Sequence, residues 1–395
     1  MKNFSILVFA VILILTMAAC GSEADANIQA TTEPSITEPQ GQQTDASEPA
    51  QEEDGLDPYI KMLMSNHYYD NGGENSDFKY IVYTCSRDDS GYIIIKEYLG
   101  TDASVVIPDT LDGFPVIGMY HSIFDNTPFV AEIVFPDSLR TVVFNTRADT
   151  DQCMVGTAWY AQQPDGVYYA GNVAVGCKGN GEITLREGTI GIGGGAFSLR
   201  KDLTSIELPA SLLMVDDDAF AGSGLTEITI PVTLQYYFGA FGTCTQLERV
   251  VFEEGITKIN GTFTGSAVRE VVLPTSLEVI GEKAFMHCEE LQYITLPANV
   301  TTIEEYAFYG SGLTSITLNE GLEYIEKYAF QHCKGLKSIY IPASVRSIDI
   351  RAVGFNIDDK PVADFIAYFP ASSSVMENLQ NTGVNCQIGT QADAS

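Results

Sequence analysis

A tandem repeat constrains this chain more than any other feature of its sequence. Related segments begin every 21 to 23 residues and share a Leu-x-x-Ile-x-Leu-Pro pattern. One of them reads LTSIELPASLLMVDDDAFAGSG and starts at Leu203; the others start at Leu225, Leu247, Val268, Leu291, Leu313 and Leu336. Repeats of roughly this length are typical of solenoids, in which each unit packs only against its neighbours. The sequence therefore predicts a stacked array of coils.

Each repeat can be interpreted as one coil of that array. Apolar and polar residues alternate in its first half, as they do in a half-buried strand. A Pro ends the strand in five coils, because Pro cannot donate to the ladder; these are Pro209, Pro231, Pro274, Pro297 and Pro342. An Ala-Phe pair follows in most coils, where the Ala permits close approach and the Phe fills the interior. One coil cannot bury enough surface to be stable alone, so neighbours must stack.

The turn after the Phe alternates between one with Cys and one with Gly-Ser. Cys244, Cys288 and Cys333 therefore recur in every second coil. Strands two coils apart are separated by nearly 10 Å, which exceeds disulfide reach. We interpret these Cys as small buried residues that close a turn. Cys153 and Cys177 bracket an insertion, and their pairing is left open.

The array resembles the BspA-like leucine-rich repeats of bacterial surface proteins. The resemblance covers residues 78–389, including an insertion at 157–179 and a closing strand, helix and strand at 363–389. It implies a mainly β fold, a curved right-handed solenoid of roughly 22-residue repeats with a small α/β C-terminal cap. A hairpin is expected to turn at Gly171-Asn172 in the insertion. The family also implies binding to host or neighbouring-cell proteins.

The chain begins with MKNFSILVFAVILILTMAAC, which predicts a lipoprotein signal peptide over residues 1–19. The apolar run is too short to span a bilayer, which needs roughly 20 residues. Met17-Ala18-Ala19-Cys20 resembles a bacterial lipobox, which implies lipidation of Cys20. An ordinary signal peptide cleaved nearby is the alternative. The lipid would be the only membrane contact and would hold the protein on the extracellular face of the membrane.

Four further parts are predicted beyond the signal peptide. Residues 20–57 have almost no large apolar side chains, which predicts a disordered acidic tether. An N-terminal capping region follows at 58–104, with a short helix from Asp57-Pro58 to Met64 and strands at 78–83 and 92–98. The array occupies 105–355, with its insertion at about 145–182, and the C-terminal cap occupies 356–390. We expect the two strands to cover the first edge of the array.

Charge excludes one class of partner. The formal net charge of −31 repels phosphate backbones, so no nucleic-acid partner is expected. We expect the protein to be a monomer whose partner is an extracellular or host protein ligand.

Candidate chemical sites are few. His287-Cys288 and His332-Cys333 suggest zinc, but no third or fourth ligand follows at usable spacing. Asp216-Asp217-Asp218 suggests calcium, yet a solvated turn is the simpler interpretation. The Gly-rich run from Gly191 to Ala196 lacks the strand–helix context of a dinucleotide site. We therefore expect no metal, no cofactor and no catalytic residue.

The remaining feature is a surface. Two columns of strand residues should face away from the core: Ser205, Glu227, Arg249, Glu270, Tyr293, Ser315 and Ser338 in one, and Glu207, Thr229, Val251, Val272, Thr295, Thr317 and Tyr340 in the other. Our hypothesis places a ligand-binding patch at Arg249, Val251, Val272, Tyr293 and Tyr340, because Arg, Tyr and exposed Val suit a protein interface. A generic strand exterior is the alternative. Another column, with Tyr236, Val279 and Tyr324, lies after the Pro turn and could compete.

Adhesion or capture of an extracellular protein ligand is the function that these features favour. A carbohydrate-binding surface module would use the same face and the many Tyr residues. A hydrolase with a site in the insertion, at residues 152–179, is the third hypothesis.

Overall fold

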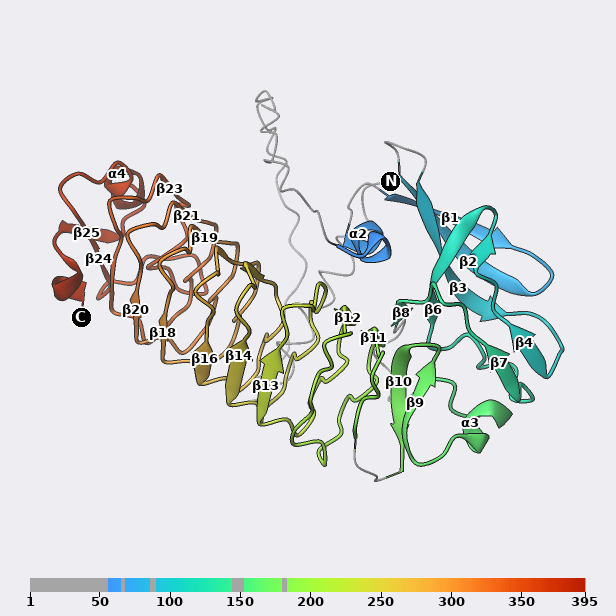
Figure 1. Cartoon of the computed structure of the whole chain (residues 1–395). Coiled ribbons are helices and arrows are strands. Elements are labelled where there is room, and N and C mark those ends of the chain that lie inside the picture. The colour runs from blue at the N-terminus through green and yellow to red at the C-terminus, as the bar shows by residue number, and fades with distance from the viewer. Residues whose placement is uncertain (1–55, 65–67, 86–89, 144–152, 180–182, 395) are drawn as a thin grey trace, which may run out of the picture. The chain divides into compact units, whose positions relative to one another are not determined.

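The computed structural model describes residues 56–394 apart from 65–67, 86–89, 144–152 and 180–182 (Figure 1). All described residues belong to one compact unit, Asp54–Ser395. The predicted signal peptide, Cys20 and the tether up to residue 55 lie outside the described residues, as do two short stretches of the predicted insertion. Nearly all regular structure in the described part is β-strand.

The N-terminal region combines a short helix with antiparallel strands. Helix α2 (Pro58–Met64) begins after Asp57, whose Oδ1 accepts a hydrogen bond from the Tyr59 backbone N–H at 2.9 Å. Strands β2 (Phe78–Cys85) and β3 (Gly91–Tyr98) pair antiparallel at the predicted positions.

Strand β1 (Tyr68–Glu74) was not predicted, because YYDNGGE lacks apolar alternation. It pairs antiparallel with β2. A Cβ on Gly73 would lie 2.2 Å from the Tyr80 ring, so the glycine is required where this strand crosses that ring.

The antiparallel strands continue directly into parallel coils. Strand β3 pairs in parallel with β6 (Phe114–Tyr120), and β6 pairs in parallel with β8 (Thr141–Val143). A second ladder joins β4 (Ser104–Val106) to β7 (Glu132–Val134), and β5 (Thr110–Leu111) forms a hairpin with β6. The first coils thus cover their edge with β3, which agrees with the expected role of this strand.

The insertion contributes one helix and a hairpin. Helix α3 (Ala158–Gln162) precedes β9 (Gly166–Ala170) and β10 (Val173–Lys178), which pair antiparallel. Gly171 has a left-handed backbone with φ +58°, as the predicted turn requires. Strand β10 then pairs in parallel with β11 (Gly191–Ile192), and β11 with β12 (Met214–Val215), so the Gly-rich run begins in a strand and continues into the repeat turn.

Two ladders of parallel strands run along the repeats (Figure 1). The strands on the first side have three or four residues: β13 (Glu227–Ile230), β14 (Arg249–Phe252), β16 (Glu270–Val272), β18 (Tyr293–Thr295), β20 (Ser315–Thr317) and β22 (Ser338–Tyr340). Those on the second side have two residues: β15 (Lys258–Ile259), β17 (Val279–Ile280), β19 (Thr302–Ile303), β21 (Tyr324–Ile325) and β23 (Ser347–Ile348). Equivalent residues pair across coils, as Val279 does with Thr302.

One expected strand does not form. The coil that starts at Leu203 has no strand at Ser205–Glu207, although its sequence alternates correctly. Ile206 is only half-buried, and the preceding segment supplies no strand to pair with it. The ladder on this side therefore begins one coil later, at β13, because alternation alone does not create a strand without a paired neighbour.

Stacked phenylalanines form the centre of the array. Consecutive rings lie 5.0–6.0 Å apart between centroids and are nearly parallel: Phe197, Phe220, Phe241, Phe263, Phe285, Phe308 and Phe330. Ala219 and Ala284, which each precede one of these rings, have no exposed surface. The prediction that small-plus-Phe pairs fill the interior is confirmed. Offset stacking adds to the burial of each ring.

The Cys turns behave as predicted. Cys244, Cys288 and Cys333 are buried free thiols. Each Sγ donates to the carbonyl oxygen of the Phe one coil earlier, at 3.0 Å for Cys244 and Phe220. Each also lies against the Ser of the preceding Gly-Ser turn, which explains the alternation of the two turn types. Cys153 and Cys177 are free as well, so the open pairing is not formed.

The closing segment follows the resemblance. Strand β24 (Ile366–Phe369), helix α4 (Met376–Gln380) and strand β25 (Asn385–Ile388) occur in the expected order, and a 3-10 turn, η2 (Gln391–Ala394), follows. The two strands extend the ladder of β22 in parallel. The described residues thus form a leucine-rich-repeat solenoid with a small α/β cap.

Candidate ligand-binding surface

The two predicted columns form real ladders along part of the array. Glu227, Arg249 and Glu270 are direct partners across β13, β14 and β16, and Val251 faces Val272 in the same register. Residues between them, such as Val250, are fully buried. The strand period of two thus places these side chains on the outer surface, as the sequence predicts.

Arg249 lies between two carboxylates. Its guanidinium bonds Glu227 at 2.7 Å and Glu270 at 3.0 Å, and these bonds raise the pKa of Arg249. All three side chains are exposed, so the pairs add little stability. Their effect is to hold the guanidinium over the strand ladder, where a ligand would meet it in a fixed position.

The structure brings together most of the predicted patch. Val272 is 38% exposed and Tyr293, on the next coil, is 67% exposed. Val251 is half-buried beside Val272. Tyr340 is half-buried on β22, two coils beyond Tyr293, so roughly 10 Å of strand ladder separates the two tyrosines. Tyr340 is therefore at the periphery.

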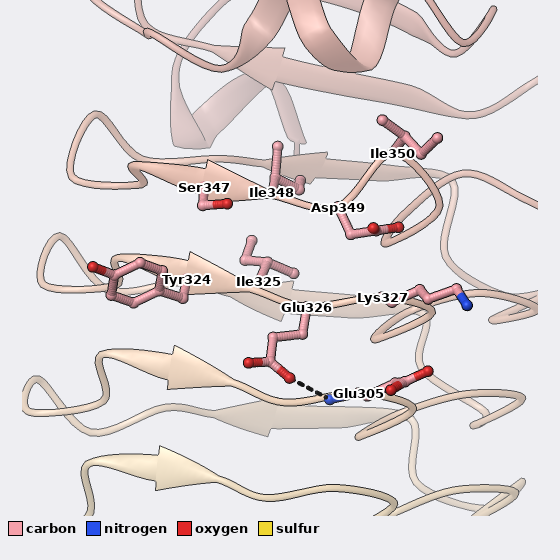
Figure 2. A pocket seen from close by; sticks show the side chains of 9 residues that line it. All are labelled: Glu305, Tyr324, Ile325, Glu326, Lys327, Ser347, Ile348, Asp349 and Ile350. Carbon is pink, nitrogen blue, oxygen red and sulfur yellow. Dashed lines mark hydrogen bonds between the residues drawn. The ribbon is translucent and has the colours of Figure 1, made fainter. Parts of the chain in front are cut away.

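The competing column contains a shallow groove. Figure 2 shows side chains of β21 and β23, with Tyr324 and Ile350 at the ends and Glu326 between them. The groove holds about 440 Å³. Glu326 accepts a hydrogen bond from the Glu305 backbone N–H at 3.2 Å, and burial raises the pKa of its carboxyl.

The other members of that column are less accessible. Tyr236 is half-buried at the start of the array, and burial raises the pKa of its hydroxyl well above the usual value. Val279 is also half-buried. Of the three predicted residues, only Tyr324 presents a large exposed surface, at 42%.

The interpretation of Asp216 as part of a solvated turn is wrong. Asp216 is buried, and its carboxyl accepts a hydrogen bond from the Thr141 hydroxyl. Asp217 is exposed, and Asp218 has a left-handed backbone with φ +58°. Asp216 turns inward because β12 ends beside β8, which supplies the hydroxyl partner.

The two histidines of the His-Cys pairs lie against a tyrosine ring. His287 and His332 are half-buried and both contact the ring of Tyr309, at centroid distances of 5.3 and 6.1 Å. Among the described residues, no three His, Cys, Asp or Glu side chains are grouped to hold a metal ion. Tyr306 and Tyr328 extend this ring contact, which sequence reasoning missed. The recurrence of Tyr two positions before the core Phe was the available signal.

The insertion offers little for acid–base chemistry. Asp165 is its only carboxylate between residues 153 and 179. Lys178 is engaged by three backbone carbonyls at the end of α3, with Nζ 2.8 Å from the Gln163 oxygen. A pair of carboxylates, which glycoside hydrolysis requires, is not supplied by this segment.

No helix among the described residues has the length and apolar character needed to cross a bilayer.

The comparisons with known proteins concern the repeats. The family described as BspA type leucine rich repeat region matches in six copies, over residues 175–262 and 260–356. A search of curated proteins found no match.

Several solved structures are similar. A leucine-rich repeat protein of T. pallidum shares 24% identity over 56% of this chain and 91% of its own, with a TM-score of 0.28. A leucine-rich repeat protein from Bacteroides ovatus shares 20% identity over 80% of this chain and 67% of its own, with a TM-score of 0.36. A leucine-rich cell surface protein from Faecalibacterium prausnitzii shares 16% identity over 82% of this chain and 97% of its own, with a TM-score of 0.25.

The family match carries the assignment. Its six copies span the coils that contain the phenylalanine stack and the parallel ladders. Residues 175–356 of this chain are therefore leucine-rich repeats of the BspA type.

Proposed function

We propose that this protein is a lipid-anchored surface protein that binds extracellular protein ligands through the outer face of β14, β16 and β18. The supporting observation is the placement of Arg249, Val251 and Val272 on the paired strands β14 and β16, with the exposed Tyr293 on the next coil. Tyr340 contributes from the periphery. Lipidation of Cys20 would hold the protein on the extracellular face of the membrane.

The chemistry of the face suits a protein partner. Arg and Tyr are the residue types that dominate binding energy at protein interfaces. Tyr293 exposes a large ring, and the two carboxylates beside Arg249 fix its guanidinium, so little side-chain freedom is lost on binding. A partner with an acceptor aimed at Arg249 and an apolar contact for Val272 would fit this face.

A capture experiment tests the proposal. The full chain is immobilised and exposed to a panel of extracellular host proteins, and bound proteins are identified. The Arg249→Ala/Tyr293→Ala variant should lose the identified ligand by at least tenfold in Kd. Tyr324→Ala, in the groove of the second ladder, is the matched control and should bind normally. Unchanged binding by the double variant would remove this face from the proposal.

Two further measurements test the anchor and the alternatives. Palmitate labelling should disappear in Cys20→Ala, and labelling that survives would contradict lipidation at that residue. A glycan array on the wild type and on Arg249→Ala/Tyr293→Ala separates a protein ligand from a carbohydrate ligand at this face, because only a glycan that binds there would be lost in the variant. Hydrolytic turnover that is lost in Asp165→Asn would favour the hydrolase alternative instead.

A further inference from the structure

Two positions in most coils have a left-handed backbone. One lies two residues before the core Phe, and the other lies two residues after it. The first set is Gly195, Asp218, Gly239, Lys283, Tyr306 and Tyr328; the second is Leu199, Gly222, Thr243, Gly265, His287, Gly310 and His332. Glycine adopts this conformation freely, whereas a residue with a Cβ does so at a cost in free energy.

Large rings occupy these positions in the C-terminal coils. Tyr306 and Tyr328 have φ values of +58° and +61°, and His287 and His332 have +55° and +62°. The array places Gly at the equivalent turn position of its alternate coils, as at Gly265. Bulky residues that persist in a strained conformation are a reason to look for a function there.

The four residues form one surface together with Tyr309, which we call the aromatic surface. Tyr309 contacts the ring of His287 at 5.3 Å, that of Tyr306 at 5.4 Å and that of His332 at 6.1 Å. Tyr306 in turn contacts Tyr328 at 4.9 Å. All five side chains are half-buried, so each ring is held by its neighbours and still keeps part of its surface exposed.

Cations lie beside two rings of the aromatic surface, and Lys327 lies over the Tyr328 ring at 4.5 Å. Lys283 lies over the Tyr306 ring at 5.9 Å and pairs with Glu282. Arg351 donates to the Tyr328 hydroxyl at 2.8 Å and pairs with Asp359 at 3.0 Å. Cations placed in this way are attracted to the ring faces and orient the rings.

A small, mostly apolar crevice adjoins the aromatic surface at His332. It is lined by His332, Phe330, Leu336, Phe355, Val362 and Phe365, among others, and holds about 50 Å³. Anchor residues at protein interfaces fill pockets that take a whole side chain. This crevice has room for a group of about methyl size, so the aromatic surface is poorly suited to a protein anchor.

We propose that the aromatic surface binds N-acetylated oligosaccharides. The apolar C–H face of a pyranose ring stacks on exposed aromatic rings, while its hydroxyls bond the polar edges. The methyl of an acetamido group would enter the crevice beside His332. This site is formed by turns after β17, β19 and β21 and is separate from the outer face at Arg249, so the proposal does not rest on the protein-binding function.

A pair of matched oligosaccharides tests the proposal by calorimetry on the full chain. A tetramer of β-1,4-linked N-acetylglucosamine should bind at least tenfold more tightly than the corresponding glucose tetramer, which lacks the acetamido group. His287→Gly/His332→Gly should weaken that binding at least tenfold. The same variant should keep or raise Tm, because glycine relieves the left-handed strain. Thr243→Gly, at the equivalent position outside the surface, is the control and should bind normally.

Several outcomes would overturn the proposal. Equal binding of the two tetramers would remove the role of the crevice, and no binding of either at millimolar concentration would remove the site. Unchanged sugar binding by the folded glycine variant would place the site elsewhere. Loss of a captured protein ligand in that variant, without sugar binding, would assign the surface to a protein.

Discussion

The Thr141 hydroxyl donates a hydrogen bond to the carboxyl of Asp216, 75 positions later in the chain. This contact joins β8, in the N-terminal sheet, to the end of β12 in the array. Asp216 is buried, and burial raises the pKa of its carboxyl to about 8. The side chain is therefore largely protonated at neutral pH, and the joint between the two ladders contains a neutral acid.

The first prediction concerns pH. Unfolding lowers the pKa of Asp216 to about 4, so the folded state holds the proton more tightly. Its stabilising effect is complete below about pH 4 and falls as pH rises towards 8, by up to about 1.4 kcal/mol per pH unit. Asp216→Asn should therefore gain stability relative to the wild type between pH 5 and pH 8, as urea unfolding would measure.

The exposed neighbour provides the control for that experiment. Asp217→Asn removes a carboxylate from the same turn but should give a stability difference that varies much less with pH. If the Asp216→Asn and wild-type curves stay parallel from pH 5 to pH 8, the buried acid is ionised in the folded protein and our account is wrong.

The second prediction concerns the thiols. Burial raises the pKa of Cys288 and of Cys333 to about 12, so almost no thiolate is present at pH 8. A thiol reagent should therefore leave both residues unlabelled in the folded protein and label them at once in denaturant. Mass spectrometry of tryptic peptides would locate the labels. Rapid native labelling of Cys288 would show that this turn opens.

Much of the fold could be predicted because its determinants are local. The position of Phe263 or Cys288 within its coil follows from the repeat spacing. The burial of these residues then follows because similar coils stack on one another. The turn at Gly171 was predictable for the same reason, since the two hairpin strands are adjacent in sequence.

The features that escaped prediction depend on contacts between distant segments. Asp216 reads as one of three acidic turn residues until β8 is known to lie beside it. The aromatic surface escaped because Tyr306 and Tyr328 occupy positions that carry Gly, Asp or Lys in other coils. The strand missing at Ser205–Glu207 has the correct alternation but no paired strand before it.

The third prediction concerns the phenylalanine stack. Phe263 is fully buried between Phe241 and Phe285, at centroid distances of 5.6 and 6.0 Å. Phe263→Ala should lower the free energy of unfolding by about 3–5 kcal/mol, because it leaves a cavity with no side chain to fill it. Denaturant titration would measure this loss. Tyr293→Ala, on the exposed face, should change stability by less than about 0.5 kcal/mol, and an equal loss in both variants would contradict the account of the stack.

The last prediction tests whether the coils are interchangeable. Deletion of residues 247–290 removes two complete coils and joins Gln246 to Leu291. The deletion preserves the alternation of turns, because the Cys244 coil is then followed by a coil with a Gly-Ser turn at Gly310. The ring of Phe241 should stack on that of Phe308, so the shortened chain should fold cooperatively with lower total stability. Circular dichroism and denaturant titration would check this, with a deletion of 247–279, which breaks the register, as the control. If the in-register deletion is as unfolded as the control, the coils do not depend on their neighbours alone, and the account of the array is wrong.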